Sequence, residues 1–246
     1  MDCRRRKIML ATGLSSAIGQ ALIDALGSDT GSAWRIISTT RANMRKACQG
    51  VPVEWVSIDF RQGFAAVLGG VERALEERAV NHLDAVVHVA GVVFSDQFQS
   101  TTAGEWRDTM AVNLDAAAAL MQAAGPRLAP GASVVLVSSV DAKVTSLAGP
   151  AAAYGASKAA LEGLARHLAV DWGAKAVRVN VVSPGALDHG AGPHGRAVET
   201  VVQRTALGRL GRADEVAEAI SFLLSDRASY ITGTVLSVDG GLGLSY

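Results

Sequence analysis

The chain has 246 residues, of which 49% are hydrophobic and 19% charged, a composition typical of a soluble globular protein. Its 23 basic and 23 acidic residues balance to a formal net charge of zero, which argues against nucleic acid as the main partner. No stretch approaches the roughly 18 apolar residues of a membrane span, so no membrane partner is expected. The length favours one domain over residues 1–246.

The amino terminus looks like the start of an export signal but stops short of one. Basic residues at 4–7 precede an apolar run, Ile8–Ala11, that ends at Thr12-Gly13. An export signal needs a longer apolar region. The two cysteines, Cys3 and Cys48, form no C-x-x-C pair. We therefore expect a reduced, cytoplasmic setting.

The first expected strand, Ile8–Ala11, leads into a glycine-rich turn, T-G-L-S-S-A-I-G at 12–19, and then a helical pattern. This is the context of a phosphate-binding loop. The helix N-terminus offers unpaired N–H groups and a positive dipole end to a pyrophosphate, and glycines let the backbone come close. Ser15 and Ser16 could add hydroxyl donors. A glycine-serine turn before any ordinary helix would look similar.

The second expected strand, Trp34–Thr39, is followed by Thr40-Arg41. In dinucleotide-binding folds an acid at this strand end holds the adenosine ribose 2′-hydroxyl, whereas an arginine accommodates a 2′-phosphate. The chain has no acid here and has an arginine, with Arg45 and Lys46 close behind. The alternative is a group of solvated charges at a helix start.

The next part of the chain alternates strands with a helix. Strands are expected at Val53–Ile58 and Leu83–Val89, with an amphipathic helix at 63–79 between them. Asp59-Phe60 ends the first of these strands, and Asp59 could simply cap a turn. His88 is expected to pack against the sheet rather than bind a metal, because no cluster of further ligands accompanies it.

Two polar features stand out in the following elements. Asn113 lies within an expected helix at 105–128, where asparagine is unfavourable, so it either bonds to a backbone group or serves a function. A strand expected at Ser133–Ser138 has Ser138-Ser139 at its carboxyl end. Ligands bind at the carboxyl ends of parallel strands in this architecture.

The helix expected at 153–173 carries Tyr154 and Lys158. Their i, i+4 spacing places phenol and ammonium on one face, about 5–6 Å apart at Cβ. A free phenol titrates near pH 10, and a neighbouring cation lowers that pKa. The pair is therefore a candidate proton donor, although an isolated pair of this spacing is more often an ordinary helix surface.

The last third has expected strands at Val177–Val182 and Thr234–Val238 and a helix at 214–224. The glycine-rich stretch 186–196 is expected to be a mobile loop that covers the substrate. Its histidines, His189 and His194, lack the further ligands of a metal site, and no metal is expected. Strands that alternate with helices in this way predict an α/β fold: a doubly wound, Rossmann-type parallel sheet of about seven strands with helices on both faces.

Eight motifs in the same order resemble the short-chain dehydrogenase/reductase family. They are T-G-L-S-S-A-I-G at 12–19, Asp59, Ala90-Gly91, V-N-L at 112–114, S-S at 138–139, Y-G-A-S-K at 154–158, V-N-V-V-S-P-G at 179–185 and I-T-G-T-V-L-S-V-D-G-G at 231–241. The resemblance covers residues 6–242 and is closest to the single-domain branch that includes 3-oxoacyl-carrier-protein reductases.

The resemblance implies four catalytic residues, Asn113, Ser139, Tyr154 and Lys158. Tyr154 would protonate the substrate oxygen as hydride arrives, or act as the base in the reverse direction. Lys158 would lower the tyrosine pKa and hold the nicotinamide ribose. Ser139 would hydrogen-bond the carbonyl oxygen, and Asn113 would hold a water that links Lys158 to solvent.

The resemblance also implies a cofactor, with NADP(H) preferred and NAD(H) as the second choice, because Arg41 is present and position 40 has no acid. Gly13 and Gly19 would frame the pyrophosphate, Asp59 would meet the adenine, and Pro184-Gly185 would contact the nicotinamide end. Further expected cofactor contacts are Ser15, Ser16, Ile18, Phe60, Ala90, Gly91, Tyr154, Lys158 and Leu187.

Three positions depart from the family pattern. Ala17 stands at the usual middle glycine, His88-Val89 replace a usual pair of asparagines, and His189 replaces a threonine that often contacts the cofactor. We expect these residues to tune affinity and substrate choice without touching the four catalytic residues.

The sequence thus favours an NADPH-dependent ketoreductase acting on a small or medium carbonyl compound, with a carrier-bound acyl group as one option. One alternative is a dehydrogenase that oxidises a secondary alcohol of a sugar, steroid or other metabolite. Another is a dinucleotide-binding scaffold or redox sensor without turnover. Substrate choice is expected to lie in residues 93–97, 141–153 and 186–198. The resemblance implies a homotetramer, or at least a homodimer, through the helices that hold Asn113 and Tyr154.

Overall fold

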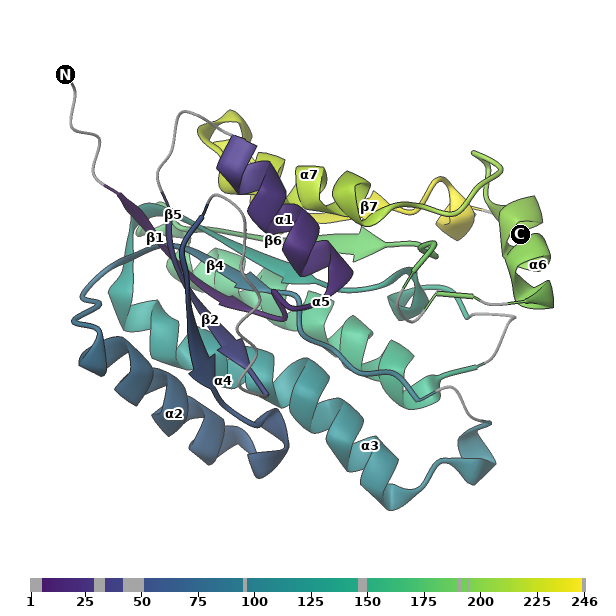
Figure 1. The fold of residues 1–246 in the computed structure, drawn as a ribbon, viewed down its shortest axis with the longest axis horizontal. Helices are drawn as coiled ribbons and strands as arrows, with labels where there is room; N and C mark the ends of the chain where they lie inside the picture. Colours follow the sequence, from purple (N-terminus) through teal and green to yellow (C-terminus); the bar gives the residue numbers. More distant parts are fainter. Residues whose placement is uncertain are drawn as a thin grey trace.

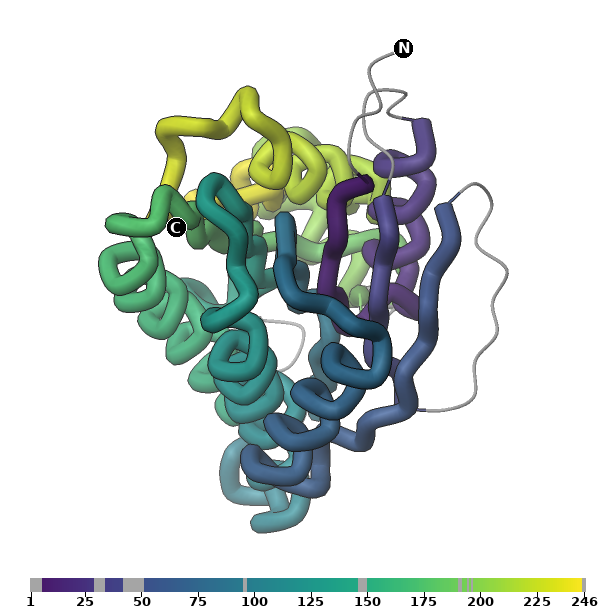
Figure 2. Tube along the Cα trace, turned by 90° about the vertical axis from the view of Figure 1, so that its left-hand side faces the viewer, coloured from purple at the N-terminus to yellow at the C-terminus, as the bar shows by residue number. Residues whose placement is uncertain are grey.

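A seven-stranded parallel sheet forms the centre of the computed structural model, which describes residues 6–28, 34–41, 51–94, 97–145, 150–189, 192–193 and 195–244. The strand order is β3-β2-β1-β4-β5-β6-β7, and every neighbouring pair is parallel. The strands are β1 (Lys7–Thr12), β2 (Trp34–Thr40), β3 (Val53–Ser57), β4 (Leu83–His88), β5 (Leu128–Val137), β6 (Arg178–Pro184) and β7 (Val235–Val238). Figure 2 shows β3, in blue, at the outer edge of the sheet. The predicted α/β fold is confirmed.

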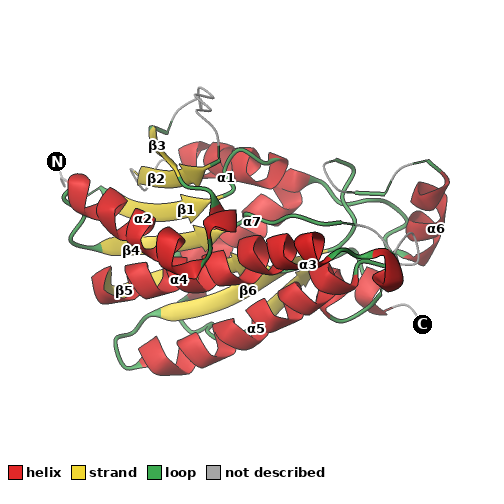
Figure 3. Ribbon diagram, turned by 90° about the horizontal axis from the view of Figure 1, so that it is seen from below, coloured by secondary structure: helices red, strands yellow, loops and turns green. Residues whose placement is uncertain are grey.

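Helices cover both faces of the sheet (Figures 1 and 3). One face carries α1 (Ala17–Ser28) and α7 (Ala213–Leu224), and the other carries α2 (Phe64–Glu77), α4 (Ala116–Ala124) and α5 (Ala152–Gly173). Each face has its own apolar core, so successive residues of one strand are buried in opposite directions. This double burial explains why the strands read as nearly continuous apolar runs.

The helix predicted at 105–128 differs from the observed one at both ends and in the middle. It begins with α3 (Ala103–Met110), because Thr102 and Glu105 form a capping box through hydrogen bonds of 3.2 and 2.8 Å. A π-helical turn, Ala111–Asp115, then joins α3 to α4. The α-helix ends at Ala124 because a 3₁₀ turn containing Gly125 and Pro126 follows it. Leu128, predicted to be helical, begins β5.

The sequence did not predict α6 (Arg196–Arg204), which lies beyond the end of the sheet in Figures 1 and 3. The only sign of it is a short apolar pattern at 197–198 and 201–202, and these four residues are half-buried. A pattern of this length gives a weak helical signal. Within the described ranges, no helix is long and apolar enough to cross a membrane.

Candidate active site

The carboxyl ends of the strands bring the predicted residues to one edge of the sheet. In the parallel register, Thr12 of β1 lies beside both Thr39 and His88, and Pro184 lies beside Val238. The predicted residues follow these ends: Gly13 after β1, Arg41 after β2, Asp59 and Phe60 after β3, Ala90 and Gly91 after β4, Ser139 after β5, and Pro184 and Gly185 at the end of β6. Ligands bind at this edge in open α/β sheets.

Asn113 is fully buried in the π-helical turn between α3 and α4. Its amide nitrogen donates to the carbonyl of Val92 at 2.9 Å and to Ser157 Oγ at 3.0 Å. Its Oδ1 accepts the N–H of Val92 at 2.8 Å. The side chain therefore bonds to the backbone, which is the first of the two alternatives expected for it. Its hydrogen bonds connect the segment after β4 to α5. The water that it was expected to hold stays a prediction.

Lys158 is almost completely buried, with 2% of its surface exposed. Its Nζ donates to the carbonyl of Val137 at 2.8 Å and lies 5.6 Å from the ring centroid of Tyr154. A Cβ on Gly91 would lie 3.3 Å from this Nζ and 3.4 Å from Asn113 Oδ1, so the absence of a side chain at Gly91 keeps space between these groups. Burial lowers the pKa of Lys158 to about 8, because the charged form loses its hydration.

Tyr154 is half-buried one turn before Lys158. Its pKa is raised, first by burial, and a hydrogen bond with Ser139 lowers it while the charge of Asp141 raises it. Burial outweighs the other effects on this pKa, and the expected lowering by Lys158 stays a prediction. The phenol keeps its proton at neutral pH, which is the form that a general acid requires.

Ser139 is buried and caps the 3₁₀ turn Val140–Ala142. Its Oγ accepts the N–H of Asp141 at 3.2 Å and donates its own proton to Asp141 Oδ2 at 3.0 Å. The sequence placed Asp141 only at the start of the substrate-choosing region 141–153. The contact with Ser139 could have been found only from the two-residue spacing at a strand end, which is a weak signal.

His88, one of the departures from the family pattern, lies within electrostatic range of a predicted catalytic residue. It is fully buried, and its Nδ1 lies 2.9 Å from Thr12 Oγ1. Its buried Nε2 has no hydrogen-bond partner among the described residues. The pKa of His88 is lowered to about 3, chiefly by burial and then by the charge of Lys158. His88 is thus electrostatically coupled to the predicted catalytic lysine.

The turn between β1 and α1 has the geometry of a close backbone approach. Gly13 has φ +72°, and a Cβ there would lie 2.4 Å from the backbone nitrogen of Ala90. Thr12 Oγ1 accepts the N–H of Ala90 at 3.3 Å, which joins the ends of β1 and β4. Ser16 Oγ accepts the N–H of Gly19 at 3.1 Å, so its hydroxyl proton remains available as a donor. Ser16 itself is exposed at the start of the helix.

The predicted adenosine end of the site is partly described. Asp59 caps the 3₁₀ turn Phe60–Gln62 by accepting the N–H of Arg61 at 3.0 Å, so the capping alternative is observed. Its contact with adenine stays a prediction. Arg41 is exposed at the end of β2. Arg45 and Lys46 lie outside the described residues.

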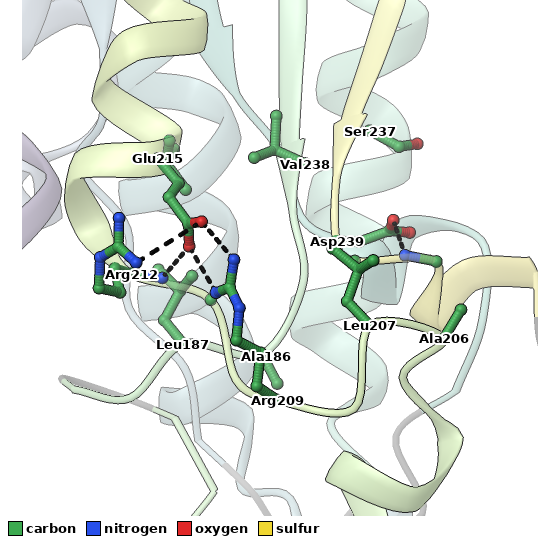
Figure 4. A pocket seen from close by; sticks show the side chains of 14 residues that line it. Ala186, Leu187, Ala206, Leu207, Arg209, Arg212, Glu215, Ser237, Val238 and Asp239 are labelled. Atoms are coloured by element: carbon green, nitrogen blue, oxygen red, sulfur yellow. Dashed lines mark hydrogen bonds and ion pairs between the residues drawn. The ribbon is translucent and has the colours of Figure 1, made fainter.

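A cavity of about 410 Å³ lies at the ends of β6 and β7 (Figure 4), and none of the four predicted catalytic residues lines it. Leu187, predicted to contact the cofactor, lines it together with Leu207 and Val238. One wall is polar, because Glu215 accepts hydrogen bonds from Arg209 and from the N–H of Arg212.

Only one of the two histidines of the sequence prediction is among the described residues. His189 Nδ1 lies 2.7 Å from Asp188 Oδ1, and His194 is outside the described residues. In the described part of the chain, no group of three or more His, Cys, Asp or Glu side chains is placed to hold a metal ion.

Comparisons with known proteins place this chain in a family. The family model described as Enoyl-(Acyl carrier protein) reductase matches residues 34–243. A 3-oxoacyl-[acyl-carrier-protein] reductase of Pseudomonas aeruginosa is 32% identical over 97% of this chain and 98% of its own. D-threitol dehydrogenase of Mycolicibacterium smegmatis is 30% identical over 96% of this chain and 92% of its own. The solved structure of a blue fluorescent protein from a metagenomic library, in complex with NADPH, is 28% identical with a TM-score of 0.85 and covers 96% of this chain and 97% of that one. With its parallel sheet and this similarity along nearly its whole length, the chain belongs to the short-chain dehydrogenase/reductase family of oxidoreductases, which bind a nicotinamide dinucleotide.

Proposed function

We propose that the protein is an NADP(H)-dependent ketoreductase that transfers a hydride between NADP(H) and a carbonyl compound or secondary alcohol. One observation carries the proposal: a protonated phenol, a serine hydroxyl and a buried ammonium converge at the carboxyl edge of the sheet. These are Tyr154, Ser139 and Lys158. An acid, an oxygen-binding donor and a cation are the groups that carbonyl reduction needs where negative charge develops on oxygen.

In this mechanism the substrate oxygen lies between Tyr154 and Ser139. Ser139 donates a hydrogen bond to the carbonyl oxygen, and Tyr154 gives it a proton as charge develops. Lys158 stabilises the resulting phenolate, because an ammonium 5.6 Å from the ring in a buried site is weakly screened. Asn113 positions Lys158 indirectly, since its hydrogen bond to Ser157 holds the residue next to the lysine. When bound, the nicotinamide dinucleotide supplies the hydride.

The residues present fit such a cofactor. The turn at Gly13 and the exposed start of α1 at Ser16 provide the open helix N-terminus that a pyrophosphate requires. At the other end, the space that the missing side chain of Gly91 leaves beside Lys158 Nζ suits the approach of a ribose hydroxyl. Gly185 lies so close to Asp239 that a Cβ would be 2.7 Å from its Cα, which fixes the backbone expected to contact the nicotinamide.

The preference for NADP(H) rests on Arg41, exposed at the end of β2, and on Thr40 in place of an acid. The NADPH complex of the solved relative supports it. Arg41→Ala should raise the Michaelis constant for NADPH and leave that for NADH nearly unchanged, because only the 2′-phosphate would lose a partner. Thr40→Asp should shift preference toward NADH. An unchanged constant for NADPH in Arg41→Ala would remove the 2′-phosphate assignment.

A second candidate function is oxidation of a secondary alcohol on a polyol or sugar. It is favoured by the similarity to D-threitol dehydrogenase over nearly the whole chain. The same residues serve either direction, with Tyr154 as acid or base, and the cofactor pools decide which one runs. A screen of NADPH oxidation across ketones, 3-oxoacyl thioesters, quinones and sugars, with the reverse reaction on polyols, would separate the two.

The proposal is tested against a non-catalytic scaffold by Tyr154→Phe. This variant keeps the ring and loses only the hydroxyl. NADPH oxidation should fall to background while cofactor binding, measured by the fluorescence of NADPH, is retained. Undiminished turnover in Tyr154→Phe would exclude Tyr154 as the acid. Absence of turnover in the unaltered protein with every carbonyl, despite NADPH binding, would favour the scaffold.

We also propose a cytoplasmic homotetramer, or at least a homodimer, with no nucleic-acid or membrane partner. The helix α5 would form part of the contact, because it exposes Val170 to 84%, whereas most alanines of α4 are buried within this chain. Light scattering of the purified protein gives the mass directly. Val170→Glu should lower that mass if α5 lies in the contact.

A further inference from the structure

Glu162 is a buried acidic residue that the mechanism proposed above does not use. It lies one turn beyond Lys158 on α5, and only 6% of its surface is exposed. Its Oε1 accepts a hydrogen bond of 3.0 Å from the hydroxyl of Ser138. An apolar side chain would fill a buried position at a lower cost in free energy than a carboxylate does. The hydrogen bond to Ser138 is therefore the feature of Glu162 that calls for a role.

This hydrogen bond is one of three contacts between successive turns of α5 and the end of β5. The pairs are Tyr154 with Ser139, Lys158 with the carbonyl of Val137, and Glu162 with Ser138. Residues four apart lie on the same face of a helix, so a single stripe of α5 contacts three consecutive residues of the chain. Two of these pairs contain groups that the proposed reaction uses. The third pair holds Ser138, the residue between the other two partners on β5.

Ser138 is fixed from both sides. Its N–H donates to the carbonyl of Val182 on β6 at 2.8 Å. Its Oγ lies 3.0 Å from Glu162 Oε1 and 3.3 Å from the carbonyl oxygen of Lys158. A hydroxyl has one proton to give, and hydrogen bonds to a carboxylate are the stronger ones, so Glu162 sets the direction of this hydroxyl. The position of Ser138 is thus determined by β6 and α5 together.

The backbone at Ser138 decides where the hydroxyl of Ser139 lies, because the two residues share a peptide group. β5 ends at Val137, and Ser139 stands in extended backbone, with φ −160° and ψ 155°, before the 3₁₀ turn that it caps. A rotation of the shared peptide would move Ser139 Oγ relative to Tyr154. A misplacement of about 1 Å in a reacting arrangement can lower a rate about 100-fold. A hydrogen bond that holds Ser138 therefore acts on the reaction without touching the substrate.

We propose that Glu162 is a positioning residue for carbonyl reduction: its hydrogen bond to Ser138 holds the end of β5 on α5 and keeps Ser139 directed at the oxygen that Tyr154 protonates. This inference rests on the proposed function. The carboxylate takes no part in the proton transfer, and its effect passes through Ser138 and Ser139 alone.

The test measures NADPH oxidation by the unaltered full-length protein and by variants of Ser138 and Glu162. The probe is ethyl 3-oxobutanoate, or the best carbonyl substrate of the screen if another is faster. Ser138→Ala and Glu162→Leu should each lower kcat about tenfold, because Ser139 is then less well placed. Glu162→Gln keeps an acceptor oxygen and should hold kcat within about threefold of the unaltered value. Each kcat is referred to the concentration of protein that binds NADPH, so partial misfolding cancels.

Ser133→Ala is the matched control for Ser138→Ala. Ser133 is a buried serine of the same strand, and its Oγ donates to the carbonyl of Leu223 on α7, across the opposite face of the sheet, at 2.9 Å. Its loss should lower the free energy of unfolding about as much as Ser138→Ala does, and it should leave kcat unchanged. Asp171→Asn removes an exposed carboxylate from α5 and should also leave kcat unchanged.

A role in positioning is separated from a role in folding by repeating the change in Ser139→Ala. That variant alone should lower kcat about 100-fold, the loss expected when one donor to a developing oxyanion is removed. Adding Glu162→Leu should then lower kcat by less than about twofold, because the residue through which Glu162 acts is gone.

Two results would overturn the inference and leave the ketoreductase in place. One is a full tenfold loss from Glu162→Leu in the Ser139→Ala background, and the other is an unchanged kcat in Glu162→Leu and Ser138→Ala alone. If the unaltered protein reduced no carbonyl compound of the screen, the proposed function would fall together with the inference.

Discussion

Replacing Lys158 by methionine should stabilise the protein at neutral pH while abolishing turnover. Lys158 is 2% exposed, and its pKa falls from 10.5 to about 8 on burial. Below pH 8 both the folded and the unfolded lysine are charged, and the fold bears the full penalty of the buried charge. The shift of 10.5 − 8 = 2.5 corresponds to about 3 kcal/mol at 1.36 kcal/mol for each pKa unit.

The penalty should disappear as pH rises. Between pH 8 and 10.5 the unfolded lysine holds its proton more tightly than the folded one, so the stability of the unaltered protein rises relative to Lys158→Met. From pH 7 to 9.5 the difference in free energy of unfolding between Lys158→Met and the unaltered protein should shrink by about 2 kcal/mol. Loss of the hydrogen bond to Val137 offsets part of the gain by about 1 kcal/mol, and this loss contributes no pH dependence of its own.

The assay is urea unfolding of both proteins at several pH values and one fixed protein concentration, because assembly would otherwise add a mass-action contribution. Lys175→Met, at an exposed lysine just beyond α5, is the matched control. The free energy of unfolding of Lys175→Met relative to that of the unaltered protein should not change over the same pH range. A flat difference for Lys158→Met as well would refute the reasoning that burial destabilises this ammonium.

Two further predictions concern residues beside the site. The pKa of His88 is about 3 in the fold against 6.5 in its ordinary state, so acid favours the unfolded chain. Between pH 7.5 and 5 the free energy of unfolding of His88→Asn should therefore fall by about 2 kcal/mol less than that of the unaltered protein. Equal acid sensitivity of the two proteins in urea unfolding would contradict this. Gly13→Ala should lower the melting temperature and weaken NADPH binding more than Gly63→Ala does. Both glycines have positive φ, at +72° and +87°, but only at Gly13 does a Cβ meet neighbouring backbone, whereas nothing lies within 4 Å at Gly63. Similar losses in the two variants would show that φ alone matters.

The sequence predicted the sheet because burial on both faces leaves a strong mark, a run of apolar residues that ends in a polar turn. Since all strands are parallel, the residues after each run had to meet at one edge, and Ser139, Gly13 and Gly91 do so. The assignment of catalytic roles to Tyr154 and Lys158 came from the family resemblance, because the spacing alone is common on helices. Neither the spacing nor the resemblance indicated that burial raises the pKa of the tyrosine.

Features that depend on contacts between segments far apart in the sequence could not be predicted from the sequence. The π-helical turn at Asn113 follows from its bonds to Val92 and Ser157, 21 and 44 residues away in the chain. The coupling of His88 to Lys158 likewise joins β4 to α5. An apolar pattern reports which face of an element is buried, but not which polar atom it meets there.

The ammonium of Lys158 favours a negative charge on Tyr154, which this residue does not carry before the reaction. Lys158 has no ion-pair partner among the described residues, and its Nζ is held by a neutral carbonyl of Val137. Burial shifts the pKa of Lys158 downward, to about 8, and that of Tyr154 upward, so at neutral pH Lys158 is charged and Tyr154 is neutral. In the proposed reaction, Tyr154 gives up its proton beside an ammonium that is already present in the same buried space, and the phenolate and the ammonium stabilise each other. The interaction is therefore stronger in the transition state than in the resting state, which is the condition for it to accelerate proton transfer rather than merely hold the fold together.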